Sequence, residues 1–231
     1  GLQVQDSGIL NKTESVITRN QNAGLQVNDE ASSATLSHVL IAYTQPTQED
    51  NSGRGVRIDE GASGSFMRSV FRENHEVGLI AGGTLSHLEL KEVLVESTRP
   101  QTSGNIGYGL ALFPGVSMVM SHSSVKGNHG FALLAKGAVI TLSQSLLSNT
   151  LPNMSDEYGD GIAAADAVLN LDGVISRDNA RAGLLYLDSG GSITGSMAKG
   201  NSIGLVTQTV NLLAGPEVAD DNVFEGNTQN I

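Results

Sequence analysis

The feature that most constrains the fold is a glycine followed by an apolar residue, which recurs along the whole chain. The repeated glycines are Gly1, Gly24, Gly55, Gly78, Gly109, Gly130, Gly161, Gly183 and Gly204. Their spacings are 23, 31, 23, 31, 21, 31, 22 and 21 residues, so over six units a short unit alternates with one that carries an insertion. A unit this short cannot bury its own apolar face, and successive units must therefore stack on one another.

Each unit holds three short runs rich in apolar residues, such as residues 25–27, 35–37 and 39–41. The 28 glycines and the absence of tryptophan are typical of short strands joined by many turns. Parallel strand connections are right-handed in nearly all proteins. We therefore expect an all-β fold, a right-handed single-stranded parallel β-helix of about nine coils with three strands per coil.

Polar residues close the units at a matching place, which predicts a structural corner. The asparagines at this corner are Asn20, Asn74, Asn128, Asn179 and Asn201. The units with insertions carry threonine there instead, as in Thr44. Stacked side-chain amides can form a hydrogen-bonded ladder, and asparagine tolerates the left-handed backbone that a tight corner often requires.

The openings at residues 24–27 and 55–58 and the closures at residues 72–74 and 126–128 resemble the coils of the pectate-lyase-like superfamily. The resemblance covers essentially the whole chain and specifies the scaffold rather than a particular member. It implies that a polysaccharide lyase or hydrolase is one possible activity, with a basic residue beside a cation or with two or three clustered acids. A leucine-rich repeat and a left-handed hexapeptide helix do not fit the spacing.

Charge and cysteine content narrow the possible partners and location. The formal net charge of −11 disfavours a nucleic-acid surface, because phosphate binding needs clustered cations. The chain has no cysteine and no apolar stretch long enough for a transmembrane helix. We expect one β-helix domain over residues 1–231, a fragment of a longer chain that lies outside the cell or at the cell surface.

The insertions provide the first candidate site. They run from Gln45 to Arg54, from Arg99 to Tyr108 and from Leu151 to Asp160, and they should leave the same corner on alternate coils as one row of loops. The third insertion carries the weak candidates for a metal site, which are Asp156, Glu157 and Asp160. Calcium is the cofactor that such carboxylates would bind, and a solvated loop without a cofactor is the alternative.

No catalytic residues can be assigned from the sequence. Arg72, Glu96 and Lys126 should lie on successive coils, where a ladder of alternating charges explains them without catalysis. The carboxylates fall at different offsets from their glycines, and the four tyrosines are too few and too dispersed along the sequence to predict a sugar-binding platform. These observations favour a non-catalytic role, although they leave enzymatic activity open.

The first strand of each unit predicts a binding face. Alternation from the glycine should place residues such as Leu110 and Phe131 inward and their neighbours outward. In the later coils these outward residues are apolar, namely Ile80, Ala111, Phe113, Ala132, Leu134, Leu185, Leu187 and Val206. Exposed apolar patches of this kind generally mark interfaces, unless the insertion loops fold back over them.

The sequence therefore favours a non-catalytic scaffold for protein recognition, adhesion or assembly. Its partner would be another protein, a second copy of the chain or the remainder of the parent chain. The alternative function is a β-helix module that binds or degrades a polysaccharide.

Overall fold

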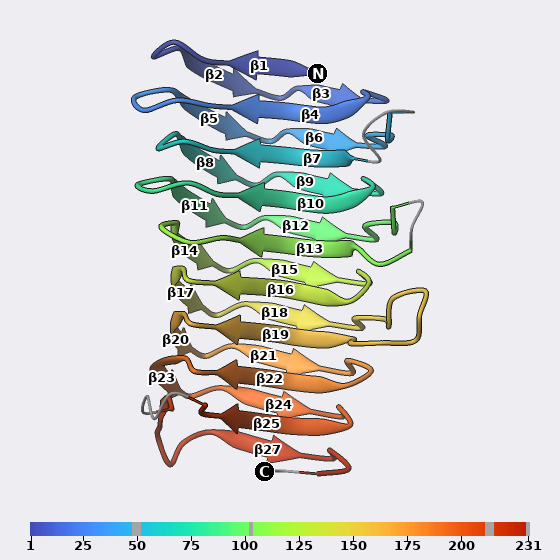
Figure 1. The fold of residues 1–231 in the computed structure, drawn as a ribbon, viewed down its shortest axis with the longest axis vertical. Helices are drawn as coiled ribbons and strands as arrows, with labels where there is room; N and C mark the ends of the chain where they lie inside the picture. Colours follow the sequence, from blue (N-terminus) through green and yellow to red (C-terminus); the bar gives the residue numbers. More distant parts are fainter. Residues whose placement is uncertain (48–51, 102–103, 211–214, 230–231) are drawn as a thin grey trace.

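The computed structural model describes residues 1–47, 52–101, 104–210 and 215–229. In these residues the chain forms 27 strands and no helix, arranged as three parallel sheets of nine strands each. Every strand pairs with the equivalent strand of the next coil, so nine coils stack along one axis (Figure 1). The fold class predicted from the glycine repeat, a right-handed parallel β-helix with three strands per coil, is confirmed.

The first sheet, sheet A, contains the first strand of every coil. Its strands are β1 (Leu2–Val4), β4 (Asn22–Val27), β7 (Gly53–Ile58), β10 (Glu76–Ala81), β13 (Gly107–Leu112), β16 (Phe131–Lys136), β19 (Asp160–Ala165), β22 (Ala182–Leu187) and β25 (Ile203–Gln208).

Sheet B contains the second strand of every coil. Its strands are β2 (Ile9–Thr13), β5 (Ser33–Ser37), β8 (Ser63–Met67), β11 (His87–Lys91), β14 (Ser117–Ser121), β17 (Val139–Ser143), β20 (Val168–Asp172), β23 (Gly190–Thr194) and β26 (Glu217–Val218).

Sheet C contains the third strands, each of which is short. These are β3 (Val16–Thr18), β6 (Leu40–Ala42), β9 (Val70–Arg72), β12 (Leu94–Glu96), β15 (Ser124–Lys126), β18 (Leu146–Ser148), β21 (Ile175–Arg177), β24 (Met197–Lys199) and β27 (Val223–Glu225).

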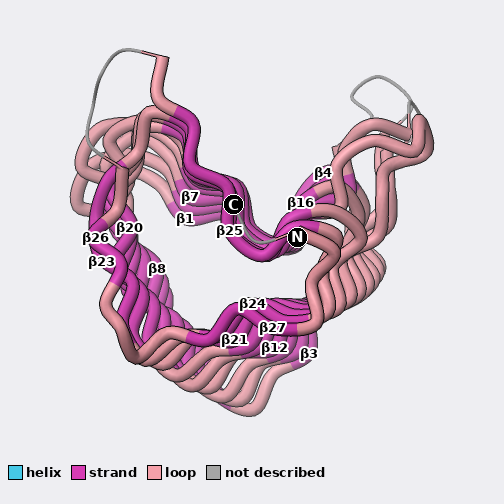
Figure 2. Tube along the Cα trace, turned by 90° about the horizontal axis from the view of Figure 1, so that it is seen from below, coloured by secondary structure: helices cyan, strands magenta, loops and turns pink. Residues whose placement is uncertain are grey.

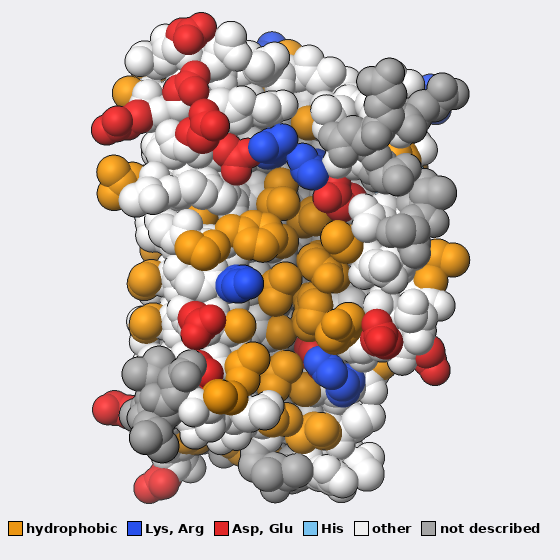
Figure 3. Space-filling model, in the orientation of Figure 1, with side chains coloured by type: hydrophobic (Ala, Val, Ile, Leu, Met, Phe, Trp, Pro, Cys, Tyr) orange, Lys and Arg blue, Asp and Glu red, His pale blue; other side chains and the backbone are white. Residues whose placement is uncertain are grey.

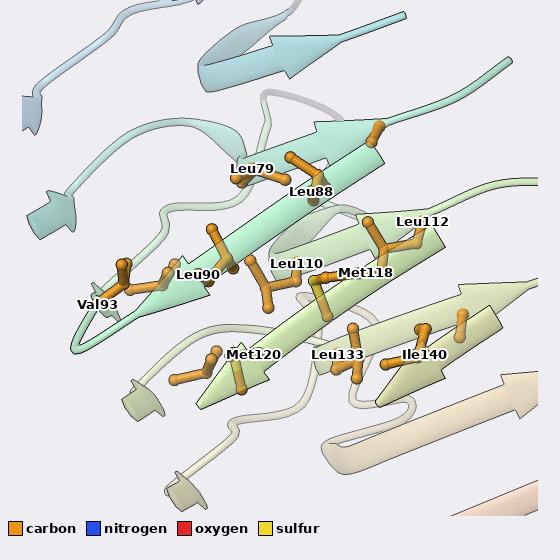
Figure 4. Close-up of a cluster of buried hydrophobic side chains, with 14 of the residues drawn as sticks. Leu79, Leu88, Leu90, Val93, Leu110, Leu112, Met118, Met120, Leu133 and Ile140 are labelled. Atoms are coloured by element: carbon orange, nitrogen blue, oxygen red, sulfur yellow. The ribbon is translucent and has the colours of Figure 1, made fainter. Parts of the chain in front are cut away.

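The core is one continuous stack of inward-facing side chains. Leu79, Leu110 and Leu133 stack from coil to coil on sheet A, opposite Leu88, Met118 and Ile140 on sheet B (Figure 4). All six are essentially inaccessible to solvent. Each buried side chain of this size contributes about 1.5–3 kcal/mol of hydrophobic free energy, and this stabilisation is realised only when neighbouring coils stack.

The corner between sheets C and A carries the insertion loops. The loops enter through isolated bridges that pair Gln21 with Gln45, His75 with Arg99 and His129 with Leu151. They leave the same edge on alternate coils, as predicted (Figure 1). Their last residues, Arg54, Tyr108 and Asp160, belong to sheet A rather than to the loops.

Four of the corner asparagines are buried between the ends of sheet C and the starts of sheet A. The side-chain oxygens of Asn74, Asn128 and Asn179 accept hydrogen bonds from the backbone N–H groups of the threonines one coil earlier, at 3.1, 2.9 and 3.1 Å. Asn201 accepts from the backbone N–H of Asn179 at 3.0 Å in the same way. Asn20, in the first closure, is half-buried, and its side-chain nitrogen has no hydrogen-bond partner among the described residues.

The left-handed residue at this corner is the one before the asparagine. Glu73 has φ 49° and Asp178 has φ 56°, whereas Asn74 and Asn179 lack positive φ. The asparagine is therefore needed because its side-chain amide accepts a hydrogen bond from the backbone of the previous coil. The left-handed backbone conformation has to be adopted by the residue before it.

Candidate binding groove on sheet A

The strands of sheet A are bent toward the interior of the β-helix, and the outer face of the sheet is therefore concave (Figure 2). In β7 both Arg54 and Arg57 are half-exposed, while Gly55 and Val56 between them are buried. Strict alternation would not place two residues three positions apart on one face, so the strand bends at Gly55. A Cβ at Gly55 would lie 2.4 Å from the carbonyl oxygen of Gly78 on the next coil, which explains why the bend needs glycine.

The bend produces three columns of outward side chains. The edge column, before the bend, contains Arg54, Val77, Tyr108, Phe131, Asp160, Ala182 and Ile203. The central column, after the bend, contains Arg57, Ile80, Ala111, Leu134, Ala163, Leu185 and Val206. The far column contains Phe113, Lys136, Ala165, Leu187 and Gln208.

From the fourth coil onward these columns form a predominantly apolar groove. Ile80, Phe113, Leu134, Leu185 and Leu187 are half-buried, as expected for side chains that line a shallow surface. Ala111, which was predicted on this face, and Ala163 are buried between their larger neighbours in the central column. Figure 3 shows hydrophobic side chains gathered along the middle of this face, below a group of charged side chains and with further charged side chains beside the strip. The same view leaves this hydrophobic strip open over much of its length.

Two residues of the sixth coil lie elsewhere than predicted. Ala132 was expected on the outward face, but it is 0% exposed and belongs to the core. Phe131 was expected inside, but it lies in the edge column and contacts the ring of Tyr108. The reason is that Ala132, rather than Gly130, occupies the bend, because Leu133 pairs with Leu110.

An aromatic row lines the edge of the groove. The ring centroids of Tyr108 and Phe131 are 4.9 Å apart, and those of Phe131 and Tyr158 are also 4.9 Å apart. The prediction that the tyrosines are dispersed was therefore wrong for Tyr108 and Tyr158. Burial raises the pKa of Tyr108, so its hydroxyl stays protonated at neutral pH. The row could have been found in the sequence by comparing, from coil to coil, the residues that directly precede the residue at the bend.

Arg181 covers the lower end of the aromatic row. Its guanidinium carbon lies 5.2 Å from the centroid of the Tyr158 ring, within the range of a cation–π interaction. The guanidinium group also forms a two-point ion pair with Asp160, with Nε to Oδ1 at 2.7 Å. Hydrogen bonding to this carboxylate is the largest cause of the raised pKa of Arg181. Asp160 is fully buried, and it also accepts a hydrogen bond from the backbone N–H of Ala182 at 3.0 Å.

A cavity of about 500 Å³ adjoins this cluster on the loop side. It is lined by Pro152, Asp156, Glu157, Tyr158, Ala180 and Arg181. We call it the loop pocket. Asn153 fixes the local loop, because its side-chain oxygen accepts hydrogen bonds from the backbone N–H groups of Ser155 and Glu157 at 3.0 and 2.9 Å.

The three metal candidates serve different roles in the structure. Asp160 is committed to Arg181, whereas Asp156 and Glu157 are exposed at the loop pocket. Within the described residues, no group of three His, Cys, Asp or Glu side chains is placed to hold a metal ion. A calcium site would need a different arrangement of these carboxylates.

At the end of the groove nearer the N-terminus, the charged side chains form ion pairs. Arg54 forms a two-point ion pair with Glu76, at 2.9 and 3.1 Å, and Arg57 pairs with Asp59. On sheet C, Glu96 lies between Arg72 and Lys126, at 3.7 and 3.4 Å. These are structural charge ladders in which each acid faces a cation.

No family model matches the sequence, and no curated protein matches it. Among the described residues, none forms a helix that could cross a membrane.

Comparison with solved structures identifies the same fold in other proteins. The chain is similar to pectate lyase Pel9A, with a TM-score of 0.55 and 12% identity over 87% of this chain and 56% of that protein. It is also similar to the enzymatically active domain of tailspike protein 2 of bacteriophage CBA120, with a TM-score of 0.44 and 9% identity over 88% of this chain and 37% of that one. The chain thus spans about half the length of the pectate lyase. At 12% identity the likeness to the pectate lyase establishes the parallel β-helix fold alone.

Proposed function

We propose that this chain is a non-catalytic recognition scaffold that binds a partner protein in the concave groove of sheet A. The observation that carries the proposal is the central column, which is apolar from Ile80 to Val206 and is flanked by Phe113 and Leu187 of the far column. Protein interfaces are built around such apolar centres with a polar rim. The proposal keeps the extracellular or cell-surface location expected from the sequence.

The charges around the groove support binding rather than catalysis. A general acid or base must be able to exchange a proton with a substrate. At the groove, Asp160, Glu76 and Asp59 each accept hydrogen bonds from an arginine, so these carboxylates are already engaged in contacts within the chain. Lys136 is the exposed cation within the far column, and the salt bridges of the described residues do not include it.

The second candidate function is polysaccharide binding, which the aromatic row favours. The rings of Tyr108, Phe131 and Tyr158 contact one another beside the exposed carboxylates of the loop pocket, and the accessible tyrosine rings could stack on the apolar face of a sugar. The far and central columns offer a sugar few hydrogen-bond partners, however, because aliphatic side chains dominate them.

One experiment separates the two functions. Peptides would be selected from a displayed library on the wild-type chain, and a panel of acidic and neutral polysaccharides would be tested for binding and cleavage. The groove variant is Leu134→Lys. Its matched control is Val119→Lys, which adds the same charge to an outward position of sheet B that is 45% exposed.

We expect peptides that bind wild type and Val119→Lys but not Leu134→Lys, together with no polysaccharide response. Light scattering on the same samples distinguishes self-association, because a dimer that dissociates on Leu134→Lys substitution identifies a second copy as the partner. Polysaccharide binding or cleavage in the absence of selected peptides would refute the proposal and favour the second function.

A further inference from the structure

We propose that two copies of this chain pack against each other through the outer face of sheet C, with the coils antiparallel and the two-fold axis between the fourth and fifth coils. This inference goes beyond the proposed function, because it concerns a different face. Sheet C lies on the side of the β-helix opposite sheet A, so both grooves stay accessible in such a dimer (Figure 2).

An apolar column runs down the outer face of sheet C. The first residue of each strand of this sheet points outward, and eight of these nine residues are apolar. Val16, Ile175 and Val223 are exposed, and the other apolar members are half-buried. The ninth member is Ser124 in the fifth coil. A continuous apolar strip of this length on the surface generally marks an interface.

The charges beside this column favour a second copy of the chain as the partner. We define the sheet C face as each strand of sheet C with the two residues before it and the one residue after it. This face carries six of the 13 Lys and Arg residues and seven of the 24 Asp and Glu residues, a net charge of −1, whereas the whole chain carries −11. Two copies of an acidic chain repel each other over most of their surface, so self-association is least opposed on this face.

The order of the charges selects the orientation of the two copies. In each coil, the residue two positions before the strand forms a ridge on one side of the apolar column, and the last residue of the strand lies on the other side. A two-fold axis parallel to the rod would place these two positions opposite each other within the same coil. In the third coil Arg68 would then face Arg72 of the second copy. In the fourth coil Glu92 would face Glu96 of the second copy, so two successive coils would repel.

An antiparallel arrangement removes this repulsion in one register. With the two-fold axis between the fourth and fifth coils, Glu96 faces Lys126 of the second copy, and this contact occurs twice. On the ridge, Glu92 faces His122 of the second copy in the same way. Over the eight coils that overlap, all of whose sheet C residues are described, no two like charges directly face each other. An axis through the fourth coil would set Glu96 of one copy against Glu96 of the other, and an axis through the fifth coil would do the same with Lys126.

The same register also fills a cavity on this face. A shallow cavity of about 720 Å³ extends along the column from the fourth coil to the seventh, and Leu94, Ser124 and Leu146 are among its lining residues. Ser124 is the smallest member of the column, and the register sets Leu94 of the second copy opposite it. One leucine from each copy therefore enters the cavity of the other.

The area of the face sets the strength of the dimer. Eight coils span about 34 Å and the face is about 16 Å wide, so two copies bury on the order of 1,100 Å² in total. This area lies just above the roughly 1,000 Å² that specific interfaces need, and we expect a dimer of micromolar affinity.

Sedimentation velocity at about 1 to 300 µM tests the interface on the wild-type chain, Leu146→Lys and Leu134→Lys. Both leucines are half-buried and belong to the sixth coil, Leu146 on sheet C and Leu134 on sheet A. Circular dichroism verifies that both variants are folded. We expect the wild-type chain and Leu134→Lys to dimerise equally, and Leu146→Lys to dimerise at least about tenfold more weakly.

A charge reversal tests the register. Lys126→Glu places an acid opposite Glu96 of the second copy at two points, and it should weaken the dimer by about tenfold at low salt. Its control, Lys136→Glu, makes the same charge change at an exposed position of sheet A and should leave the dimer unchanged.

Spin labels test the orientation, because the chain has no cysteine of its own. Single cysteines would replace Asn11 and Val119, which lie in one outward column of sheet B in the first and fifth coils. In the antiparallel dimer the two labels at residue 11 are about 34 Å apart along the axis, and those at residue 119 about 5 Å. Pulsed electron paramagnetic resonance should therefore give the longer distance at residue 11.

A monomer at every concentration, or a dimer that Leu146→Lys leaves intact, would overturn the inference. Equal label distances at residues 11 and 119 would show parallel copies and would overturn it as well. A dimer that only Leu134→Lys dissociates would place self-association in the groove of sheet A instead. Peptide binding that requires Leu134 is a separate readout, so the proposed function stands or falls independently of these results.

Discussion

Replacing Asn179 by alanine should destabilise the chain far more than the same substitution on the surface of the same coil. Asn179 is 3% exposed. Its side-chain oxygen accepts from the backbone N–H and the hydroxyl of Thr150, at 3.1 and 2.8 Å, and its side-chain nitrogen donates to Asn201 at 3.0 Å. Asn201 keeps the backbone N–H of residue 179 as a donor, so the groups left without this partner are the buried N–H and hydroxyl of Thr150.

The magnitude follows from these contacts. An unsatisfied buried N–H costs about 1–3 kcal/mol, and the lost side-chain hydrogen bonds cost about 1 kcal/mol more. We expect Asn179→Ala to lower the free energy of unfolding by about 3 kcal/mol. The control is Asn170→Ala on sheet B, where a half-buried side chain accepts one hydrogen bond from Ser192 at 3.1 Å. Its cost should stay below about 1 kcal/mol.

The assay is urea unfolding followed by circular dichroism, combined with amide hydrogen exchange. Stacked coils contact only their neighbours, so the loss of protection should concentrate in β18 and β21, the sheet C strands of the sixth and seventh coils. A difference of 2 kcal/mol corresponds to about a 30-fold change in protection. Equal effects of the two substitutions would show that the amide corner does not hold the coils together.

Three further predictions concern the site and the core. Burial lowers the pKa of His75 below the usual 6.5 of a histidine, so the unfolded chain binds the proton more readily and stability should fall as the pH drops below about 6.5. The loss of urea stability between pH 7.5 and pH 5 should be smaller for His75→Gln than for the wild-type chain, and an equal loss would contradict this prediction. Arg181→Ala should cost about 3 kcal/mol, because the buried carboxylate of Asp160 loses its only cation and keeps only the hydrogen bond from the backbone N–H of Ala182. Asp160→Ala should cost less, because Arg181 is 41% exposed and water can solvate it, although the N–H of Ala182 loses its side-chain acceptor. Thermal unfolding that ranks the two variants in the opposite order would refute this reasoning. Leu110→Ala should cost about 2–5 kcal/mol in urea unfolding, and a value below 1 kcal/mol would mean that the stack collapses around the lost side chain.

The repeat of glycine and apolar residues was sufficient to predict the coils, because stacking is the only way such short units bury their apolar side chains. It also placed the insertion loops, since an excess of residues between two paired strands has to leave at one corner. These predictions depend on spacing and polarity, which the sequence displays directly.

The bend of sheet A was not predicted, because alternation was counted only from the glycine onward and the residue before the glycine was not assigned to the strand. A bulge changes which side chains point outward without changing the apolar pattern on either side of it. In the sixth coil the error was larger, because Ala132 takes the bend while Gly130 stands two residues earlier with φ 76°. The glycine that looked like the repeat serves a different backbone position there.

The aromatic row escaped sequence analysis for a related reason. Tyr108 and Asp160 were counted as the last residues of insertions, although they begin the strands β13 and β19. Once the strand is extended back across the bend, residues from three coils fall into one column, and the loop adds Tyr158 beside them. The groove therefore depends on a feature of the backbone, the bend, that brings a second wall of side chains opposite the first. A flat sheet with the same central column would offer a partner one apolar strip, whereas the bent sheet offers a floor, an aromatic wall and a charged pocket in one place.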